Sequence, residues 1–384
     1  MNGNLIIHGA RKLDADGLVD DFWFASSEGA IDAVGTGDAW RGHIGDAKVV
    51  DAEGHWLTPG FIDLHGHGAG GYSYDDGPGE LLAALATHRA HGTTRSVISL
   101  VANPLADLRD SLEVIAGLAE RDPLVLGAHL EGPFLAPSKR GAHNPDFLRD
   151  PQPELVESLI AAARGTLRQI TIAPELPNAL EAIDVLVAAG VVVAVGHTEA
   201  TEDQARGAFD RGARLLTHAF NAMPGIHHRE PGPVVAAFED DRVTLELILD
   251  GLHVHPDVAR LAFRQAPGRI ALITDSMAAA GSADGDYRLG TLNVTVARGL
   301  AVLSGTTRIA GSTLTQDAAL RIAVDRARLS PAAAVEALTL TPARVLGREH
   351  ELGLLRAGYA ADAVLLDHDW SVRGVWAEGA PIAV

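Results

Sequence analysis

The chain has 384 residues, of which 47% are hydrophobic and 21% charged, a mixture typical of a globular protein with a large core. It contains no cysteine, which excludes disulfides, thiolate metal sites and a cysteine nucleophile, so any metal must be bound by His, Asp or Glu. The formal net charge of −19 argues against nucleic acid or an anionic membrane surface as a general partner, while a local basic pocket could still bind a small anion.

The beginning of the chain and its longest apolar run bear on localisation. The first residues, MNGNLIIHGARK, lack the basic stretch and long apolar core of a signal peptide. The longest apolar run, near Val185–Val195, is shorter than the roughly 20 residues that span a bilayer. We therefore expect a cytoplasmic protein that has no membrane partner.

Both ends of the chain have the pattern of short strands separated by Gly and Asp. The C-terminal stretch begins near Leu352 and includes the strand-like Ala363–Leu366. We predict a small β-sandwich domain built from both termini, residues 1–54 plus 348–384. Its N-terminal strands are expected at Leu5–His8, Phe22–Ser26, Ala30–Val34 and Lys48–Asp51.

The middle of the chain alternates apolar strand-like runs with Ala- and Leu-rich helical patterns. Eight such alternations predict an α/β fold, a (β/α)8 TIM-like barrel over residues 55–347. Short β-like pieces over Ser282–Leu303 predict a hairpin excursion after the eighth strand. The expected strands are Trp56–Leu64, Ser96–Val101, Leu124–Leu130, Gln169–Ala173, Val191–Val195, Arg214–Thr217, Val243–Leu249 and Ile270–Thr274. Examples of the expected helices are Glu80–Ala90, Glu154–Ala163, Ala179–Ala188 and Thr201–Arg211.

Most of the predicted strands end in a histidine or a carboxylate. They are His65 and His67 after the first run, Glu131 after the third, His197 after the fifth, His218 after the sixth, His253 after the seventh and Asp275 after the eighth. Active sites of parallel barrels form where the carboxyl ends of the strands meet. We therefore expect these side chains to share one rim.

Each of these side chains alone has an ordinary structural explanation. A His-x-His pair occurs in many loops, Asp275 could cap the following segment, and Glu131 could be a structural ion-pair partner. The convergence of the whole set on one rim instead favours a metal site.

Imidazole nitrogens and carboxylate oxygens suit a borderline divalent ion such as Zn²⁺, although Fe²⁺, Co²⁺, Mn²⁺ and Ni²⁺ can occupy similar sites. Such an ion lowers the pKa of a bound water toward about 7. Asp275 would act as general base and then deliver the proton to a leaving amine. Some enzymes with this rim bridge two metals through a carboxylated lysine. The chain has only Lys12, Lys48 and Lys139, none at the end of a predicted barrel strand, so Glu131 is the natural substitute.

The motifs around these residues resemble the N-acetylglucosamine-6-phosphate deacetylases of the amidohydrolase superfamily, over essentially the full length. The segments that carry the resemblance are PGFIDLHGHGAGG (59–71), HLEGPF (129–134), GAHN (141–144), APE (173–175), GHT (196–198), THAFNAMPG (217–225), REPG (229–232), DGLHV (250–254), TDSMAAAG (274–281) and AGSTLT (310–315). The TPARVLG (341–347) and AGYAADAVLL (357–366) segments resemble the closing stretch of the superfamily more generally.

The resemblance implies a role for each matching residue. Glu131, His197 and His218 would hold the catalytic metal, and Asp275 would be the general base and acid. Amino-sugar recycling that releases glucosamine 6-phosphate and acetate would be the biological role. The implied substrate-binding set consists of Ala142, His143, Asn221, Ala222, His253, Ile309, Ala310 and Gly311.

Arg229 is implied to reach the phosphate from the neighbouring subunit, which makes a homodimer the expected assembly. A planar guanidinium binds phosphate well, and the local HHRE run is basic within an acidic chain. The alternative is an ion pair of Arg229 with Glu230 or another surface carboxylate.

Some members of the family replace the His-x-His pair with Gln and Asn and bind one metal. This chain has both His65 and His67, so we expect a second metal ion, giving one or two per subunit.

Other interpretations stay open at this point. The substrate could be the epimeric N-acetylgalactosamine 6-phosphate, and the motifs do not distinguish a dimer from a tetramer. Cyclic-amide hydrolysis is disfavoured by HLEGPF and by the lack of a bridging lysine. A non-catalytic barrel scaffold would be expected to lack the metal ligands that this chain retains.

Overall fold

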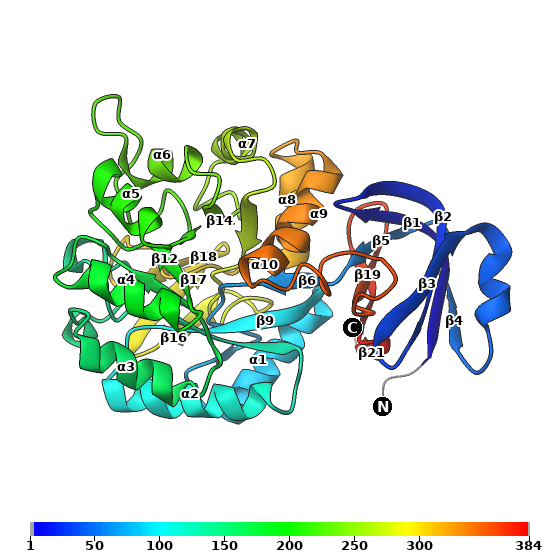
Figure 1. Ribbon diagram of the computed structural model, residues 1–384, viewed down its shortest axis with the longest axis horizontal. Coiled ribbons are helices and arrows are strands. Elements are labelled where there is room, and N and C mark those ends of the chain that lie inside the picture. The colour runs from blue at the N-terminus through cyan, green and yellow to red at the C-terminus, as the bar shows by residue number, and fades with distance from the viewer. Residues whose placement is uncertain (1–3, 383–384) are drawn as a thin grey trace. The chain divides into compact units, whose positions relative to one another are not determined.

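The computed structural model describes residues 4–382, which form two compact units (Figure 1). One unit comprises the described part of residues 1–63, 88–95 and 316–384, and the other comprises residues 64–87 and 96–315. The predicted domain limits, 1–54 plus 348–384 and 55–347, stay a prediction, and their outermost residues lie outside the described range. Within residues 4–382, no helix combines the length and apolarity needed to cross a membrane.

The strands of both termini belong to one eight-stranded sheet in the order β21-β20-β19-β5-β1-β2-β3, with β4 also paired to β1. This confirms that the two ends of the chain build a common β structure. The strands are β1 (Leu5–Asp14), β2 (Gly17–Ser27), β3 (Ala30–Thr36), β4 (Lys48–Asp51), β5 (Trp56–Pro59), β19 (Ala363–Leu366), β20 (Val372–Ala377) and β21 (Ala380–Ile382).

Strands β1 and β2 show how this sheet pairs and buries its side chains. The first half of β1 pairs in parallel with β4 and its second half with β5, and its register with β2 shifts between Ile7 and Ala10. Successive side chains of a strand point to opposite faces, and β2 follows this rule. Phe24 packs in a cluster with Leu365 of β19 and Trp376 of β20, whereas the adjacent Trp23 packs with Trp40 of the 3-10 helix η1 (Gly37–His43).

The second eight-stranded sheet is the predicted parallel barrel, in the order β15-β14-β13-β12-β11-β10-β9-β6. Its ends approach each other beyond the last paired residues. The Asp275 backbone N–H donates to the His65 carbonyl at 2.8 Å, and the His67 N–H donates to the Ser276 carbonyl at 2.8 Å. The strands are β6 (Phe61–Asp63), β9 (Thr93–Leu100), β10 (Val125–Glu131), β11 (Leu167–Ile172), β12 (Val192–Val195), β13 (Leu215–Leu216), β14 (Thr244–Ile248) and β15 (Ile270–Ile273).

One expected strand was wrong in its limits. The run Trp56–Leu64 is divided between β5, which belongs to the terminal sheet, and β6, which belongs to the barrel. Gly60 separates the two strands. A Cβ at Gly60 would lie 2.2 Å from Thr94 Oγ1, so this close approach requires glycine. A continuous apolar run hides such a break because both strands are buried.

Helices follow most barrel strands, and α2, α3, α4 and α5 lie side by side in chain order (Figure 1). The helices are α1 (Pro78–Ala90), α2 (Leu105–Ala119), α3 (Pro153–Ala162), α4 (Ala179–Ala188), α5 (Glu202–Asp210), α6 (Gly232–Phe238), α7 (Pro256–Gln265), α8 (Gln316–Asp325), α9 (Pro331–Leu338) and α10 (Leu340–Val345).

The expected excursion after the eighth strand is a three-stranded antiparallel sheet, which confirms the departure from the βα rhythm at Ser282–Leu303. It consists of β16 (Gly285–Leu289), β17 (Leu292–Ala297) and β18 (Leu300–Leu303). A two-stranded piece, β7 (Gly68–Ala69) and β8 (Tyr72–Ser73), follows the first barrel strand.

A buried ion pair gives a stability prediction. Arg95 Nε donates to Asp362 Oδ2 at 2.7 Å, and both side chains are at most 7% exposed. Asp362→Ala removes the nearer carboxylate from a buried guanidinium that Glu378 contacts only at 3.5 Å, and it is expected to lower the free energy of unfolding by about 3 kcal/mol. Asp20→Ala, which removes an exposed ion pair with Arg11, should cost no more than about 1 kcal/mol. Urea denaturation measures both, and equal losses would contradict the prediction.

Candidate active site

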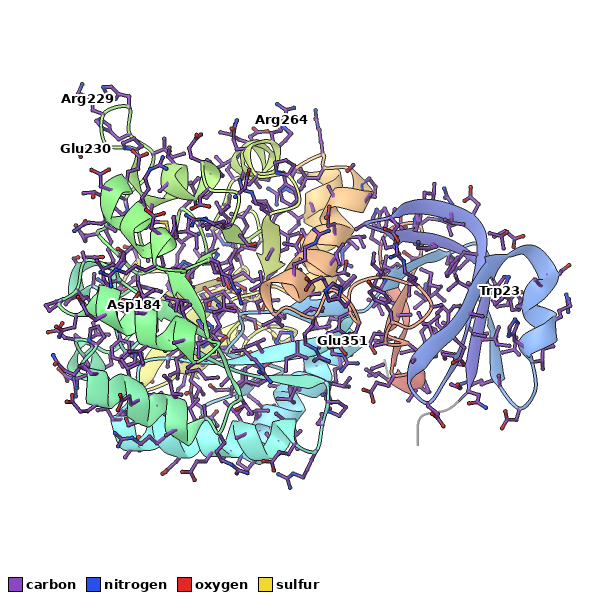
Figure 2. All side chains as sticks on the ribbon, viewed as in Figure 1. Trp23, Asp184, Arg229, Glu230, Arg264 and Glu351 are labelled. Atoms are coloured by element: carbon purple, nitrogen blue, oxygen red, sulfur yellow. The ribbon has the colours of Figure 1, made fainter. Side chains whose placement is uncertain are left out.

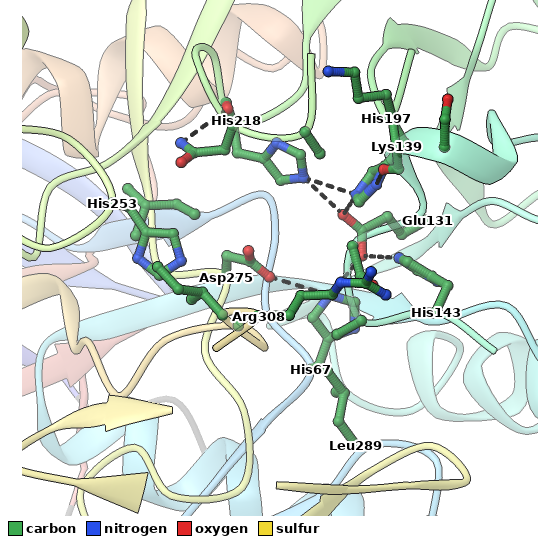
Figure 3. Close-up of a pocket in the computed structure, with 18 residues that line it drawn as sticks. His67, Glu131, Lys139, His143, His197, His218, His253, Asp275, Leu289 and Arg308 are labelled. Carbon is green, nitrogen blue, oxygen red and sulfur yellow. Dashed lines mark hydrogen bonds and ion pairs between the residues drawn. The ribbon is translucent and has the colours of Figure 1, made fainter. Parts of the chain in front are cut away.

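All of the side chains expected at the barrel rim except His65 line one pocket (Figure 3). Glu131 is the last residue of β10. His65, His197, His218 and Asp275 each lie two residues beyond the end of their strands, β6, β12, β13 and β15. The structure brings these side chains together at the carboxyl ends of the strands.

Three of these residues have an unusual backbone conformation. The φ angles of His197, His218 and Asp275 are +47°, +27° and +44°, in or near the left-handed region that residues other than glycine seldom adopt. Such conformations cost about 1–3 kcal/mol each and cluster at functional sites. The rim is therefore held in a conformation that local stability alone would not select.

Glu131, His197 and His218 form what we call the first ligand cluster. Glu131 Oε1 lies 3.0 Å from His197 Nε2 and 3.1 Å from His218 Nε2, and the two nitrogens are 3.0 Å apart. All three side chains are at most 6% exposed.

His65, His67, Glu131 and Asp275 form the second ligand cluster. His67 Nε2 lies 3.2 Å from Glu131 Oε2, 3.4 Å from Asp275 Oδ1 and 3.2 Å from His65 Nε2. The carboxylate of Glu131 is therefore common to the two clusters.

The spacing of these atoms fits a divalent metal ion. Ligands about 2.0 Å from a tetrahedral zinc ion are about 3.3 Å apart, which matches the separations within both clusters. The four atoms of the second ligand cluster lie within 4.8 Å of one another, and so do those of a group formed by Glu131, His143 and His197. Imidazole and carboxylate groups are the donors that a cysteine-free site offers to zinc and similar ions.

The charges in the pocket determine the ionisation of its carboxyl groups. Burial alone would raise the pKa of the Glu131 carboxyl, but the His65 and His197 imidazoles outweigh it and hold that pKa well below its usual value. Burial would lower the pKa of His67, but hydrogen bonds to Asp275 and Glu131 raise it to about 9. Both carboxylates therefore stay ionised at neutral pH, because the pKa of Asp275 is also lowered by His65 and His67 against the effect of burial.

The Lys139 carbonyl and His143 orient side chains of the two clusters. The sequence offered no indication of the first and suggested a different role for the second. His197 Nδ1 donates to the Lys139 carbonyl at 2.7 Å, so its Nε2 is free to face the first ligand cluster. The Ala102 N–H donates to His143 Nδ1 at 3.1 Å, so His143 donates from Nε2 to Glu131 Oε2 at 3.1 Å. His143, expected as a substrate contact, thus also supports a ligand.

The expected substrate-binding residues mostly line a pocket of about 300 Å³ beside the two clusters. Ala310 differs, because it is fully buried in an apolar cluster with Met277 and Val294. The members that line the pocket are Ala142, His143, Asn221, Ala222, His253, Ile309 and Gly311.

Arg229 lies elsewhere, at the tip of an exposed loop before α6 (Figure 2). Within residues 4–382 it makes no ion pair with a carboxylate, and its Nη1 lies 2.7 Å from His228 Nε2. The alternative of an ion pair with Glu230 is therefore not what the described residues show.

The pocket contains further residues that the sequence did not single out: Ser138, Lys139, Leu289 and Arg308. Arg308 Nη1 donates to the Gly141 carbonyl at 3.2 Å, which joins the segment after β18 to the loop that carries Ala142. The scarcity of lysine in an acidic chain was the available signal for Lys139.

Residues 56–382 match the amidohydrolase family, and the chain belongs to that family. It is 38% identical to N-acetylgalactosamine-6-phosphate deacetylase of Escherichia coli O157:H7, over 97% of this chain and 98% of that protein. It is 33% identical to N-acetylglucosamine-6-phosphate deacetylase of Vibrio furnissii, over 97% and 92%. An N-acetyl-D-glucosamine-6-phosphate deacetylase variant from Mycobacterium smegmatis, solved with N-acetyl-D-glucosamine-6-phosphate, is 42% identical, covers 100% of both chains and has a TM-score of 0.93.

Metal binding should stabilise the folded protein. Adding Zn²⁺ to metal-depleted protein at about 100 times its dissociation constant is expected to raise the free energy of unfolding by about 2.7 kcal/mol, because the ion binds the native cluster. The thermal unfolding temperature reports the change. His197→Ala should abolish the gain, whereas His350→Ala, which alters an imidazole that is 88% exposed, should retain it. An equal gain in both variants would contradict the assignment.

Proposed function

We propose that the chain is a metal-dependent deacetylase that hydrolyses the N-acetyl group of N-acetylglucosamine 6-phosphate. The products are glucosamine 6-phosphate and acetate, and the role is amino-sugar recycling in the cytoplasm. The observation that carries the proposal is the first ligand cluster, which lies beside Asp275 in a pocket lined by residues of the expected sugar-binding set. The family membership and the names of the similar proteins support the same reaction.

Zn²⁺ is the metal that the donor set favours, held by Glu131, His197 and His218. A divalent ion in that position supplies Lewis acidity, which activates water and stabilises developing negative charge. We propose a second ion for His65, His67, Glu131 and Asp275.

Asp275 is the proposed general base. Its Oδ1 faces His67 within the second ligand cluster, and its carboxyl is ionised at neutral pH. It accepts a proton from the attacking water and delivers that proton to the leaving nitrogen, so one group acts first as base and then as acid.

Asp250 fixes the orientation of His253, which we propose contacts the substrate. Its Nδ1 donates to Asp250 Oδ2 at 2.7 Å, and the same carboxylate accepts the backbone N–H of His253 at 2.8 Å. Burial lowers the pKa of His253, but Asp250 outweighs it and the net shift is upward. The pair therefore presents Nε2 to the pocket as a hydrogen-bond donor for the acetamide oxygen or a sugar hydroxyl (Figure 3).

The phosphate is proposed to bind near Asn221 and Ala222, with Arg229 supplied by the other subunit of a homodimer. The exposed position of Arg229 supports this, because its guanidinium is available to a neighbouring chain and does not line its own pocket among the described residues.

N-acetylgalactosamine 6-phosphate is the second candidate substrate. The 38% identity over nearly the full length with the Escherichia coli enzyme named for that sugar favours it. The two sugars differ in the configuration of one hydroxyl, so the ratio of kcat/KM for the epimeric phosphates distinguishes the candidates.

Acetate release tests the reaction directly. Wild-type protein loaded with Zn²⁺ should release acetate from N-acetylglucosamine 6-phosphate, and from its epimer at a lower kcat/KM. Asp275→Asn is expected to lower kcat by about 10²–10⁴-fold, because the proton has no acceptor. Asp241→Asn, at a fully exposed carboxylate, should keep the wild-type rate. No acetate from either phosphate would sink the proposal, and faster release from the unphosphorylated sugar would sink its phosphate requirement.

The origin of Arg229 can be tested by complementation. Arg229→Ala should raise KM for the phosphorylated sugar about 10–100-fold, as expected for lost charge-assisted hydrogen bonds, whereas Arg264→Ala on another exposed surface should not. Co-expression of Arg229→Ala with Asp275→Asn should restore about one quarter of the sites, because a mixed dimer has one complete site. Failure to recover would show that Arg229 acts within its own chain or not at all.

A further inference from the structure

Glu246 is a charged residue in the middle of an apolar strand. It lies in β14 between Leu245 and Leu247, and its side chain is fully buried inside the barrel. A buried carboxylate is costly unless its oxygens are hydrogen-bonded, and a neutral residue would avoid the cost. The partners of Glu246 therefore indicate why a carboxylate is present.

Each oxygen of this carboxylate has a partner. Oε1 accepts from Gln169 Nε2 at 2.8 Å, and Oε2 accepts from the His218 backbone N–H at 3.3 Å. Oε2 also lies 3.2 Å from His65 Nδ1. Nδ1 of His65 therefore faces the carboxyl group of Glu246.

The consequence for His65 is that its Nε2 is turned away from Glu246. That nitrogen lies 3.2 Å from His67 Nε2, 3.3 Å from Glu131 Oε1 and 3.6 Å from Asp275 Oδ1. It therefore points at the centre of the second ligand cluster, where a cation would be bound.

His65 is held more closely than the neighbouring histidines. Within residues 4–382, Nδ1 of His67 and Nδ1 of His218 have no hydrogen-bond partner. The ring of His65 also packs edge-on against His129, with centroids 4.5 Å apart and an interplanar angle of 82°. His129 is itself fixed between Ser99 and Thr171, so the ring of His65 has little freedom to rotate.

We propose that Glu246 is a positioning residue that sets the ring orientation of His65. It thereby determines whether a second divalent ion binds to the second ligand cluster. The inference rests on the second metal proposed above. Loss of such a carboxylate partner typically weakens metal binding about 10–100-fold. The first ligand cluster depends on Glu246 much less, because the carboxylate contacts the backbone of His218 and not its ring.

The test measures Zn²⁺ binding to full-length protein equilibrated with chelator-buffered Zn²⁺. Wild type should bind two equivalents per chain. Glu246→Gln should weaken the second dissociation constant about 10–100-fold and change the first by less than about threefold. An amide has one acceptor oxygen and a competing donor, so it cannot replace both carboxylate oxygens. In ¹⁵N-histidine NMR spectra of the zinc-loaded protein, the Nδ1 signal of His65 should shift between wild type and the variant, because the group that Nδ1 faces has changed.

Thr93→Val is the matched control. It removes a buried hydroxyl that donates to Gln316 Oε1 at 2.9 Å, at the start of β9 and therefore at the strand end opposite the rim. Both dissociation constants should stay at the wild-type values. Should Glu246→Gln fail to fold, Glu246→Asp keeps the charge with a shorter reach and should weaken the second dissociation constant selectively.

Each other result overturns the inference. A second dissociation constant that Glu246→Gln and Glu246→Asp leave unchanged shows that Glu246 does not position His65. Equal weakening of both constants shows a general structural role. A single equivalent in wild type removes the second metal and this inference with it. Acetate release is a separate measurement, so the proposed reaction stands or falls independently.

Discussion

The shared carboxylate of Glu131 is the interaction on which the site depends. One oxygen faces His197 and His218, and the other faces His67 and His143. A buried carboxylate without partners would be very unfavourable, so the segments that supply these imidazoles must all arrive at the end of β10. Closing the barrel and bringing the imidazoles to Glu131 are therefore the same structural requirement.

The requirement explains the strained backbone of the rim. His197, His218 and Asp275 turn into positive φ directly after their strands, which a free peptide would avoid. Packing of the barrel fixes the strand ends, and the metal-binding geometry gives a functional reason to tolerate the conformation. The Asp275–His65 and His67–Ser276 backbone hydrogen bonds show that the residues closing the barrel are the ligands themselves or their neighbours.

The sequence predicted much of this arrangement because each ligand follows an apolar run by a nearly constant distance. The carboxyl ends of parallel barrel strands meet at one rim, so this regular spacing predicted that Glu131, His197, His218 and Asp275 lie close together. The break at Pro59–Gly60 was missed, because both flanking strands are buried and hydrophobicity alone does not reveal which sheet a strand joins.

Supporting contacts were harder to predict. The Lys139 carbonyl and the Ala102 N–H act through the backbone, and backbone groups have no sequence signature. Glu246 did have one, since a carboxylate between two leucines contradicts the pattern of a buried strand. Its contact with His65 nevertheless joins residues 181 positions apart, which only the folded barrel reveals.

The segment 137–143 illustrates how tightly metal and sugar sites can be connected. Its Lys139 carbonyl holds His197, its His143 ring holds Glu131, and its Ala142 forms part of the pocket wall. A shift of this segment would disturb ligand orientation and pocket shape together. Coupling between two binding events is reciprocal. An ion that ordered the segment would strengthen sugar binding, and the sugar would strengthen ion binding by the same factor. The residues that contact the two clusters and those that line the pocket thus meet in one loop.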